Sequence, residues 1–175
     1  MFLIETERLQ LCHFNVDDAE FVLTLVNDPG WIRFIGDRDI HTVAQAKAYL
    51  QDGPMASYAT NGFGLYLVRR TADNVRLGMC GLVKRPSLPH VDIGFAFLAE
   101  YTGKGYAFEA ATAVLNYAHS DLNLKPIVAI TAPDNHRSVR LLEKLGLQFH
   151  KMVSLSEGEP QVNLFYPKDI QVKAR

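Results

Sequence analysis

Residues 91–118 read VDIGFAFLAEYTGKGYAFEAATAVLNYA, and three patterns typical of different structures follow one another in this stretch. It begins with an apolar run typical of a strand, and from Ala107 onward alanine and larger apolar residues recur at helical spacing. Between the two lies a turn with two glycines, Gly103 and Gly105. Glycines before a helix let the backbone approach a bulky anion, and the exposed N–H groups of the helix supply donors. The order of the three patterns therefore predicts a turn that can bind a pyrophosphate.

This turn matches neither of two common nucleotide-binding motifs. A P-loop has four residues between its glycines and a Ser or Thr after its lysine, whereas here Gly105 directly follows Lys104. A dinucleotide fingerprint has a third glycine where this chain has Phe108. A glycine turn before a helix is by itself more often a simple connector, so its interpretation depends on the neighbouring segments.

Residues 63–98, which lead to the glycine turn, have the periodicity of strands. Apolar runs, alternating or continuous, cover residues 63–68 and 75–83, and a third run covers residues 91–98. Turn residues at 72–74 and 86–89 separate the three runs. This spacing favours an antiparallel meander of three consecutive strands.

The N-terminal third predicts a strand followed by two helices. Residues 8–14 alternate polar and apolar side chains like a half-buried strand. Asn15 can cap a helix that ends at Asn27-Asp28-Pro29-Gly30. A capping box that begins at Thr42 opens a second helix, which is expected to end at Gly53-Pro54.

The stretch between these helices, residues 31–40, is expected to be a loop. It contains Trp31, Phe34 and Arg38, whose mixture of aromatic and charged side chains could line a pocket for an acceptor substrate. Surface packing between the helices explains the same residues equally well, so both interpretations stay open.

After the long helix the pattern returns to strand, helix and strand. Residues 127–131 are apolar and β-branched, as in a buried strand, and a new helix is expected to begin at Asn135. Residues 147–155 and 162–166 are expected to be closing strands. The chain is thus predicted to be one mixed α/β domain, residues 1–175, with a strand-helix-strand crossover after its antiparallel start.

Composition and charge argue against several classes of function. A formal net charge of −1 supplies no basic surface for nucleic acid or for an anionic membrane. Cys12 and Cys80 each lie in an apolar run, and the histidines have no paired ligand spacing, so no metal site is predicted. The N-terminus lacks the pattern of a signal peptide and no stretch is long and apolar enough to span a membrane, so a cytoplasmic protein is expected.

Three segments together resemble the GNAT N-acetyltransferases: the strand Asp92–Leu98, the turn Gly103–Ala107 and the segment Asn135–Leu147. The opening Glu5-Thr6-Glu7-Arg8-Leu9 resembles the RimJ/RimL-type branch of that family, which is named for the N-terminal acetylation of ribosomal proteins. The resemblance covers nearly the whole chain. It implies a three-layer fold in which helices flank a central, mostly antiparallel, mixed sheet that splays open.

The resemblance also implies where acetyl-coenzyme A binds. Backbone N–H groups of the glycine turn should hold the coenzyme pyrophosphate, and the backbone at Phe97 and Leu98 should contact the pantetheine arm where two strands splay apart. Asn135 should offer its side-chain amide, a role that is compatible with capping a helix. Thr102 stands where the family usually has Gln or Arg and receives no side-chain role. The candidate coenzyme-binding residues are Phe97, Leu98, Thr102, Gly103, Lys104, Gly105, Tyr106, Ala107, Asn135 and Ser138.

Catalysis requires a neutral amine, although an alkylamine with a pKa of about 10.4 is mostly charged at neutral pH. Asp92 matches the position where many relatives of this type carry a glutamate proposed to act as a base through water; otherwise it would be a solvated carboxylate at a strand end. Leu142 stands where many relatives have a tyrosine suspected of protonating the leaving thiolate. A thiol with a pKa of about 8.5 can leave without that acid.

The resemblance therefore implies an acetyl-coenzyme A-dependent N-acetyltransferase that acts by direct attack in a ternary complex. The acceptor would be a primary amine, either a protein N-terminus or a small molecule. A domain that binds acyl-coenzyme A or a partner without turnover is the alternative. Relatives of this type often dimerise, so a homodimer is a candidate assembly.

Overall fold

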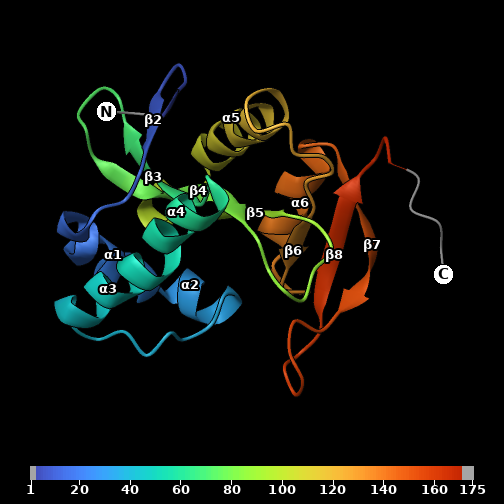
Figure 1. The fold of residues 1–175 in the computed structure, drawn as a ribbon, viewed down its shortest axis with the longest axis horizontal. Coiled ribbons are helices and arrows are strands. Elements are labelled where there is room, and N and C mark those ends of the chain that lie inside the picture. The colour runs from blue at the N-terminus through green and yellow to red at the C-terminus, as the bar shows by residue number, and fades with distance from the viewer. Residues whose placement is uncertain (1–2, 171–175) are drawn as a thin grey trace.

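The computed structural model describes residues 3–170, which form two sheets that meet edge to edge (Figure 1). The first sheet is antiparallel throughout, in the order β1-β2-β3-β4-β5. Its strands are Ile4–Glu5 (β1), Leu9–Cys12 (β2), Leu65–Arg70 (β3), Arg76–Val83 (β4) and Asp92–Phe97 (β5). The predicted meander of β3, β4 and β5 is confirmed.

The second sheet contains Ala129–Thr131 (β6), Leu147–Val153 (β7) and Val162–Pro167 (β8), in the order β6-β8-β7. A parallel bridge between Asp92 and Val128 joins the two sheets. On either side of this bridge, the N–H of Ile93 donates to the Val128 carbonyl at 2.9 Å and the N–H of Val128 donates to the Val91 carbonyl at 3.0 Å. Beyond the bridge β5 and β6 diverge (Figure 1), so the predicted splay of the sheet is present.

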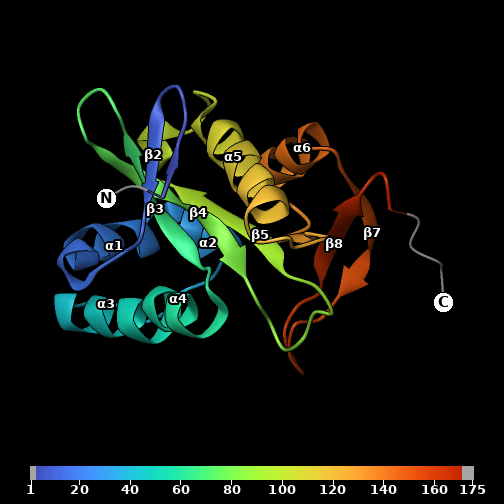
Figure 2. The same cartoon turned by 45° about the horizontal axis from the view of Figure 1, so that its top comes forward.

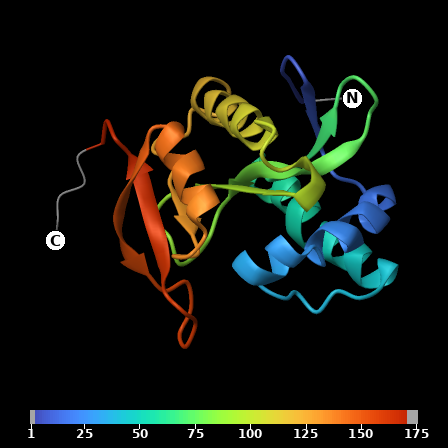
Figure 3. The ribbon, with the colours of Figure 1, turned by 180° about the vertical axis from the view of Figure 1, so that it is seen from behind.

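Helices cover both faces of the five-stranded sheet, as Figures 2 and 3 show from two sides. One face is covered by α1 (Ala19–Val26), α2 (Pro29–Phe34), α3 (Val43–Leu50) and α4 (Ala56–Asn61). The opposite face is covered by α5 (Tyr106–Ser120), and α6 (His136–Lys144) packs against β6 and β7. This arrangement confirms the predicted fold class.

The N-terminal helices correct two predictions. Residues 29–34 form α2, so Trp31 and Phe34 lie on a helix and not in a loop. The segment that ends α1 also starts α2, because Asp28 accepts the N–H of Gly30 at 2.9 Å and Pro29 occupies the first helical position.

The second helix does not end at Gly53-Pro54. The chain continues through a π-helical segment, Gln51–Met55, into α4, and ends at Gly62 with φ +78°. A π turn shifts the backbone partners by one residue, which lets the helix pass Pro54, a residue without an N–H. Among residues 3–170, no helix combines the length and the apolar composition that a membrane span requires.

Candidate active site

The edge of β5 that faces β6 carries free backbone groups. Because β4 and β5 pair antiparallel and the N–H of Leu98 donates to the Leu77 carbonyl at 3.0 Å, the alternation of the ladder turns the N–H and C=O of Phe95 and Phe97 away from β4. On that side β6 has diverged, and the pairing between the two strands is confined to the bridge near Asp92 in the described part of the chain. Phe95 and Phe97 therefore present polar backbone atoms to the gap between the sheets.

Leu98 differs from Phe97 in this respect. Its N–H is bonded to Leu77, and its carbonyl accepts the N–H of Tyr101 at 2.9 Å. Both of its backbone groups therefore have partners, whereas Phe95, which the sequence analysis did not single out, has the same orientation as Phe97.

The glycine turn forms a concentrated set of free donors. Gly103 and Gly105 have φ values of +75° and +83°, in the left-handed region that favours glycine. None of the N–H groups from Gly103 to Phe108 donates a hydrogen bond within residues 3–170. The last three of these residues form the first turn of α5, where the helix dipole also favours an anion. The structure thus provides the arrangement that a bound pyrophosphate needs.

Thr102 holds the entry of this turn. Its N–H and its hydroxyl both donate to the Ala99 carbonyl, at 3.2 and 2.8 Å. The hydroxyl proton is therefore used within the turn.

Asn135 lies on the opposite side of the gap from β5, four residues after the end of β6. Its side-chain oxygen accepts the N–H of Ser138 at 3.3 Å, so it caps α6. The amide NH₂ group of Asn135 donates to no other group among the described residues. Capping therefore leaves two donors of this side chain available.

Asp92 is a buried carboxylate and not a solvated one. Its exposed fraction is 1%, Arg85 donates from Nε to Oδ1 at 2.9 Å, and Oδ2 is buried without a partner in the part of the chain that the structure describes. Burial raises the pKa of Asp92, and the charge and hydrogen bond of Arg85 oppose that rise. Ile93 packs on the α5 side and Ala96 on the side of α1–α3, so strand alternation places the Asp92 side chain toward the N-terminal helices.

Helix α2 bridges the two strands at the open end of the gap. Asp28 Oδ2 accepts the N–H of Ala99, directly after β5, at 3.1 Å. Arg33 forms an ion pair of 3.4 Å with Asp134, which precedes α6. The sequence showed no signal for either contact, because each joins segments more than seventy residues apart.

The three residues suggested for the acceptor have different surroundings. Trp31 is 5% exposed in the core beneath the N-terminal helices, with its indole N–H unpaired among the described residues. Phe34 is half-buried and Arg38 is exposed. Burial raises the pKa of Tyr49 on α3, and the positive charges of Arg38 and Arg85 oppose this rise.

The position suspected of carrying a general acid is part of the core. Leu142 is 1% exposed and packs in the cluster beneath α5 and α6. It has no group that can protonate a leaving thiolate.

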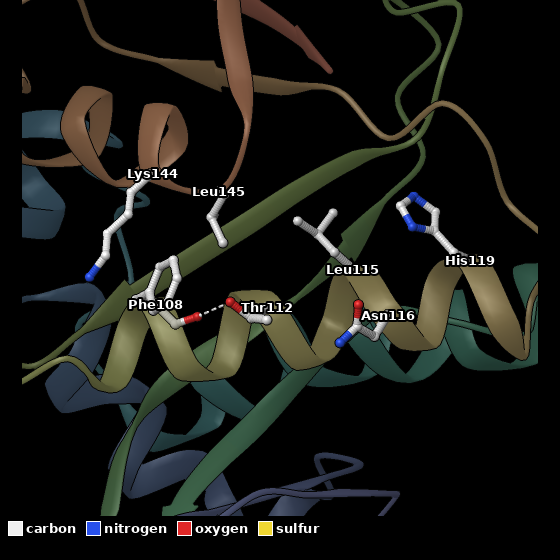
Figure 4. Close-up of a pocket in the computed structure, with 7 residues that line it drawn as sticks. All are labelled: Phe108, Thr112, Leu115, Asn116, His119, Lys144 and Leu145. Carbon is white, nitrogen blue, oxygen red and sulfur yellow. Dashed lines mark hydrogen bonds between the residues drawn. The ribbon is translucent and has the colours of Figure 1, made fainter. Parts of the chain in front are cut away.

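A groove lies between α5 and the end of α6 (Figure 4), and its first lining residue, Phe108, follows the glycine turn by three residues. It has a volume of about 260 Å³ and is lined by Phe108, Thr112, Leu115, Asn116 and His119 of α5 and by Lys144 and Leu145 at the end of α6. The Lys144 ammonium lies 4.1 Å from the centre of the Phe108 ring. The sequence analysis did not identify this apolar and basic surface, because it depends on how two helices pack.

The sequence and the fold were compared with those of known proteins. Residues 8–148 match the model of a family described as an acetyltransferase (GNAT) domain. The chain is 29% identical over 145 residues to the uncharacterized N-acetyltransferase YnaD of Bacillus subtilis (strain 168), which covers 83% of this chain and 82% of that protein. A GNAT-family acetyltransferase from Bacillus anthracis superposes with a TM-score of 0.76 and 26% identity, over 95% of this chain and 96% of that one. RimL, a ribosomal L7/L12 alpha-N-protein acetyltransferase solved in complex with coenzyme A, superposes with a TM-score of 0.80 at 13% identity, over 96% and 99% of the two chains.

Proposed function

Because the chain belongs to the GNAT acetyltransferase family and is an acyltransferase, we propose that it transfers the acetyl group of acetyl-coenzyme A to a primary amine. The observation that carries this proposal is the run of six free N–H groups from Gly103 to Phe108, placed at the end of a strand whose edge is open. A pyrophosphate and an extended amide-containing arm are the ligand groups that suit these two features.

Successive parts of the coenzyme match the glycine turn and the open edge of β5. The N–H groups of the glycine turn would bind the pyrophosphate, and the backbone of Phe95 and Phe97 would pair with the amides of the pantetheine arm, as a further strand would. The free amide of Asn135 would contact the same arm from the opposite side of the gap. The groove that begins at Phe108 offers an apolar and basic surface for the nucleotide end.

The acceptor would approach from the side of α1–α3. The side chains of Asp92 and Ala96 face that side, whereas the coenzyme turn precedes α5 on the other. Two substrates on opposite sides of one strand can meet at its edge, which supports direct attack of the amine on the thioester in a ternary complex. Half-buried Phe34 and exposed Arg38 are the acceptor contacts that we propose.

We assign the role of general base to Asp92. The burial that raises its pKa makes the carboxylate more basic, and its unpaired Oδ2 can receive a proton through a water. Because Leu142 lacks an acidic proton, the leaving thiolate would be protonated by solvent. The acceptor can be a protein N-terminus, as in the name of RimL, or a small-molecule amine.

The proposal is tested by measuring thiol release from acetyl-coenzyme A with pooled small amines and with peptides that have free N-termini. We expect release that depends on both the protein and one class of amine. Tight binding of acetyl-coenzyme A without turnover on any member of the panel would instead favour a binding module that lacks catalysis.

A further inference from the structure

The opening segment of the chain folds over the start of α5. The turn between β1 and β2 contains Thr6 and Arg8 and lies beside the segment that leads into α5 (Figure 2). This is the stretch whose sequence resembles the RimJ/RimL-type branch, and no step of the reaction described above uses it.

Glu109, in the first turn of α5, holds both residues. Its Oε1 accepts the Thr6 hydroxyl at 2.6 Å and the backbone N–H of Arg8 at 2.9 Å, and its Oε2 accepts Nε of Arg8 at 2.6 Å. Partial burial raises the pKa of Glu109, but the hydrogen bonds from Thr6 and Arg8 outweigh this and hold the pKa below its usual value. The carboxylate is therefore ionised at neutral pH and fixes the position of the guanidinium.

Arg8 in turn holds the glycine turn. Its Nη1 donates to the Lys104 carbonyl at 3.0 Å, and its guanidinium stacks 4.6 Å from the centre of the Tyr106 ring. A β-carbon placed on Gly105 would lie 3.2 Å from Nη2, so the guanidinium lies on the side of the second glycine where a side chain would be.

The glycine turn has little other support. Apart from the Arg8 contact, the only hydrogen bond to residues 103–105 within the described part of the chain is the one from the N–H of Glu109 to the Gly105 carbonyl. Glycines in the left-handed region lose much conformational freedom when they are ordered. A turn that must order on binding weakens affinity, and a contact that orders it beforehand restores affinity.

We propose that Arg8 is a positioning residue that keeps the glycine turn in its anion-binding conformation, through a clamp formed by Thr6, Arg8 and Glu109. The inference rests on the proposed coenzyme site. Arg8 acts through the Lys104 carbonyl and the Tyr106 ring, because its fork of donors joins Glu109 on one side to the turn on the other. A lysine has a single ammonium and cannot replace that fork.

The test compares Arg8→Ala and Arg8→Lys with the unmodified protein, by calorimetry with coenzyme A and by steady-state kinetics. Both variants should bind coenzyme A roughly tenfold more weakly, as expected for the loss of a hydrogen bond from a charged donor. The value of kcat at saturating coenzyme and the acceptor KM should stay within about twofold, because the reacting groups are untouched. Glu109→Gln, which keeps the shape but removes the charge, should weaken binding in the same direction.

Arg76→Ala is the matched control. Arg76 is as exposed as Arg8, 41% against 42% for the side chains, and it also pairs with a carboxylate, that of the buried Asp18, but it does not contact the turn. It should lower Tm without changing coenzyme affinity. Unchanged affinity in both Arg8 variants, or full affinity in Arg8→Lys, would overturn the positioning role. An unmodified protein that binds no coenzyme A would refute the proposed function itself.

Discussion

Asp92→Asn is the substitution that tests the proposed base most sharply. Asparagine keeps the size of the side chain and an oxygen that can still accept the Arg85 Nε–H, 2.9 Å away in the structure. It removes the charge and the basic Oδ2. The change therefore separates the basicity of the carboxylate from the hydrogen bond that anchors the start of β5.

The expected loss follows from the role assigned to this group. General-base catalysis contributes about 10²- to 10⁴-fold, which corresponds to a barrier increase of about 2.7 to 5.4 kcal/mol. Because we place the acceptor on the side of this carboxylate, coenzyme affinity should stay the same.

The assay is thiol release at saturating substrates, from about pH 6 to about pH 10, over which the neutral fraction of an alkylamine acceptor rises from a trace to about a quarter. The difference between the two proteins should be largest near neutral pH and should shrink as the neutral amine becomes abundant. The unmodified protein should lose activity toward acid at a higher pH than an ordinary carboxyl would cause, because burial raises the pKa of Asp92.

The pH dependence of stability provides an independent check of the direction in which the pKa of Asp92 is shifted. A carboxyl whose pKa is raised in the folded state contributes stability at low pH that is lost as the pH rises through the folded pKa. Asp92→Asn should therefore gain Tm relative to the unmodified protein as the pH rises from the acid range toward neutrality. Near-normal kcat at neutral pH, with chemistry shown to be rate-limiting, would refute the assignment and leave Asp92 as a structural partner of Arg85.

Three further outcomes are expected. Phe34→Ala and Arg38→Ala should raise the acceptor KM and leave coenzyme affinity unchanged in calorimetry, and the reverse pattern would place the acceptor elsewhere. Gly81→Ala should lower the free energy of unfolding by more than about 2 kcal/mol in denaturant titrations, because the new β-carbon would lie 2.1 Å from the carbonyl oxygen that precedes β3. Gly94→Ala, whose β-carbon would meet its nearest atom at 3.5 Å, is the control and should cost less. Glu109→Gln should lose stability above the usual glutamate pKa and approach the unmodified protein as the pH falls below it, because the folded pKa is lowered; a constant difference in Tm at every pH would contradict this.

The elements that the sequence predicted well are those whose signals are local. The apolar runs that form β3, β4 and β5 are each bounded by turn residues a few positions away in the sequence. The glycine turn likewise directly precedes the helical pattern of α5. The order of these elements in the structure is therefore the order that the sequence predicted.

The N-terminal helices were harder because the same residues serve two purposes. Asn27 to Gly30 end α1, which the sequence predicted, and the same segment caps α2, which it did not. Burial of Trp31 follows from α2, since a helix turns this side chain inward while Arg38, beyond the helix, stays exposed. Pro54 would end a helix on local grounds, and only the packing of the whole segment allows the π turn.

The candidate site combines predictable and unpredictable parts. The glycine turn follows from its sequence, but Arg85 beside Asp92 and Glu109 beside Arg8 depend on side chains that meet only in the folded chain. A solvated Asp92 was a reasonable expectation from its place at a strand end. The structure buries it because Arg85 and the bridge to Val128 close around that end.

The most direct test of the account is calorimetric titration of coenzyme A into the unmodified protein, Gly105→Glu and Gly158→Glu. Gly105 and Gly158 have similar φ values, +83° and +80°, so both variants place a side chain in the left-handed region and add the same charge, but Gly158 lies between β7 and β8. A β-carbon at residue 105 would also lie 3.2 Å from Nη2 of Arg8, whereas one at residue 158 would meet no atom within 4 Å. A carboxylate at residue 105 would occupy and repel the phosphate position. We expect binding to the unmodified protein and to Gly158→Glu, and no detectable binding to Gly105→Glu. A folded Gly105→Glu protein with unchanged affinity would contradict the coenzyme site on which the proposed function depends.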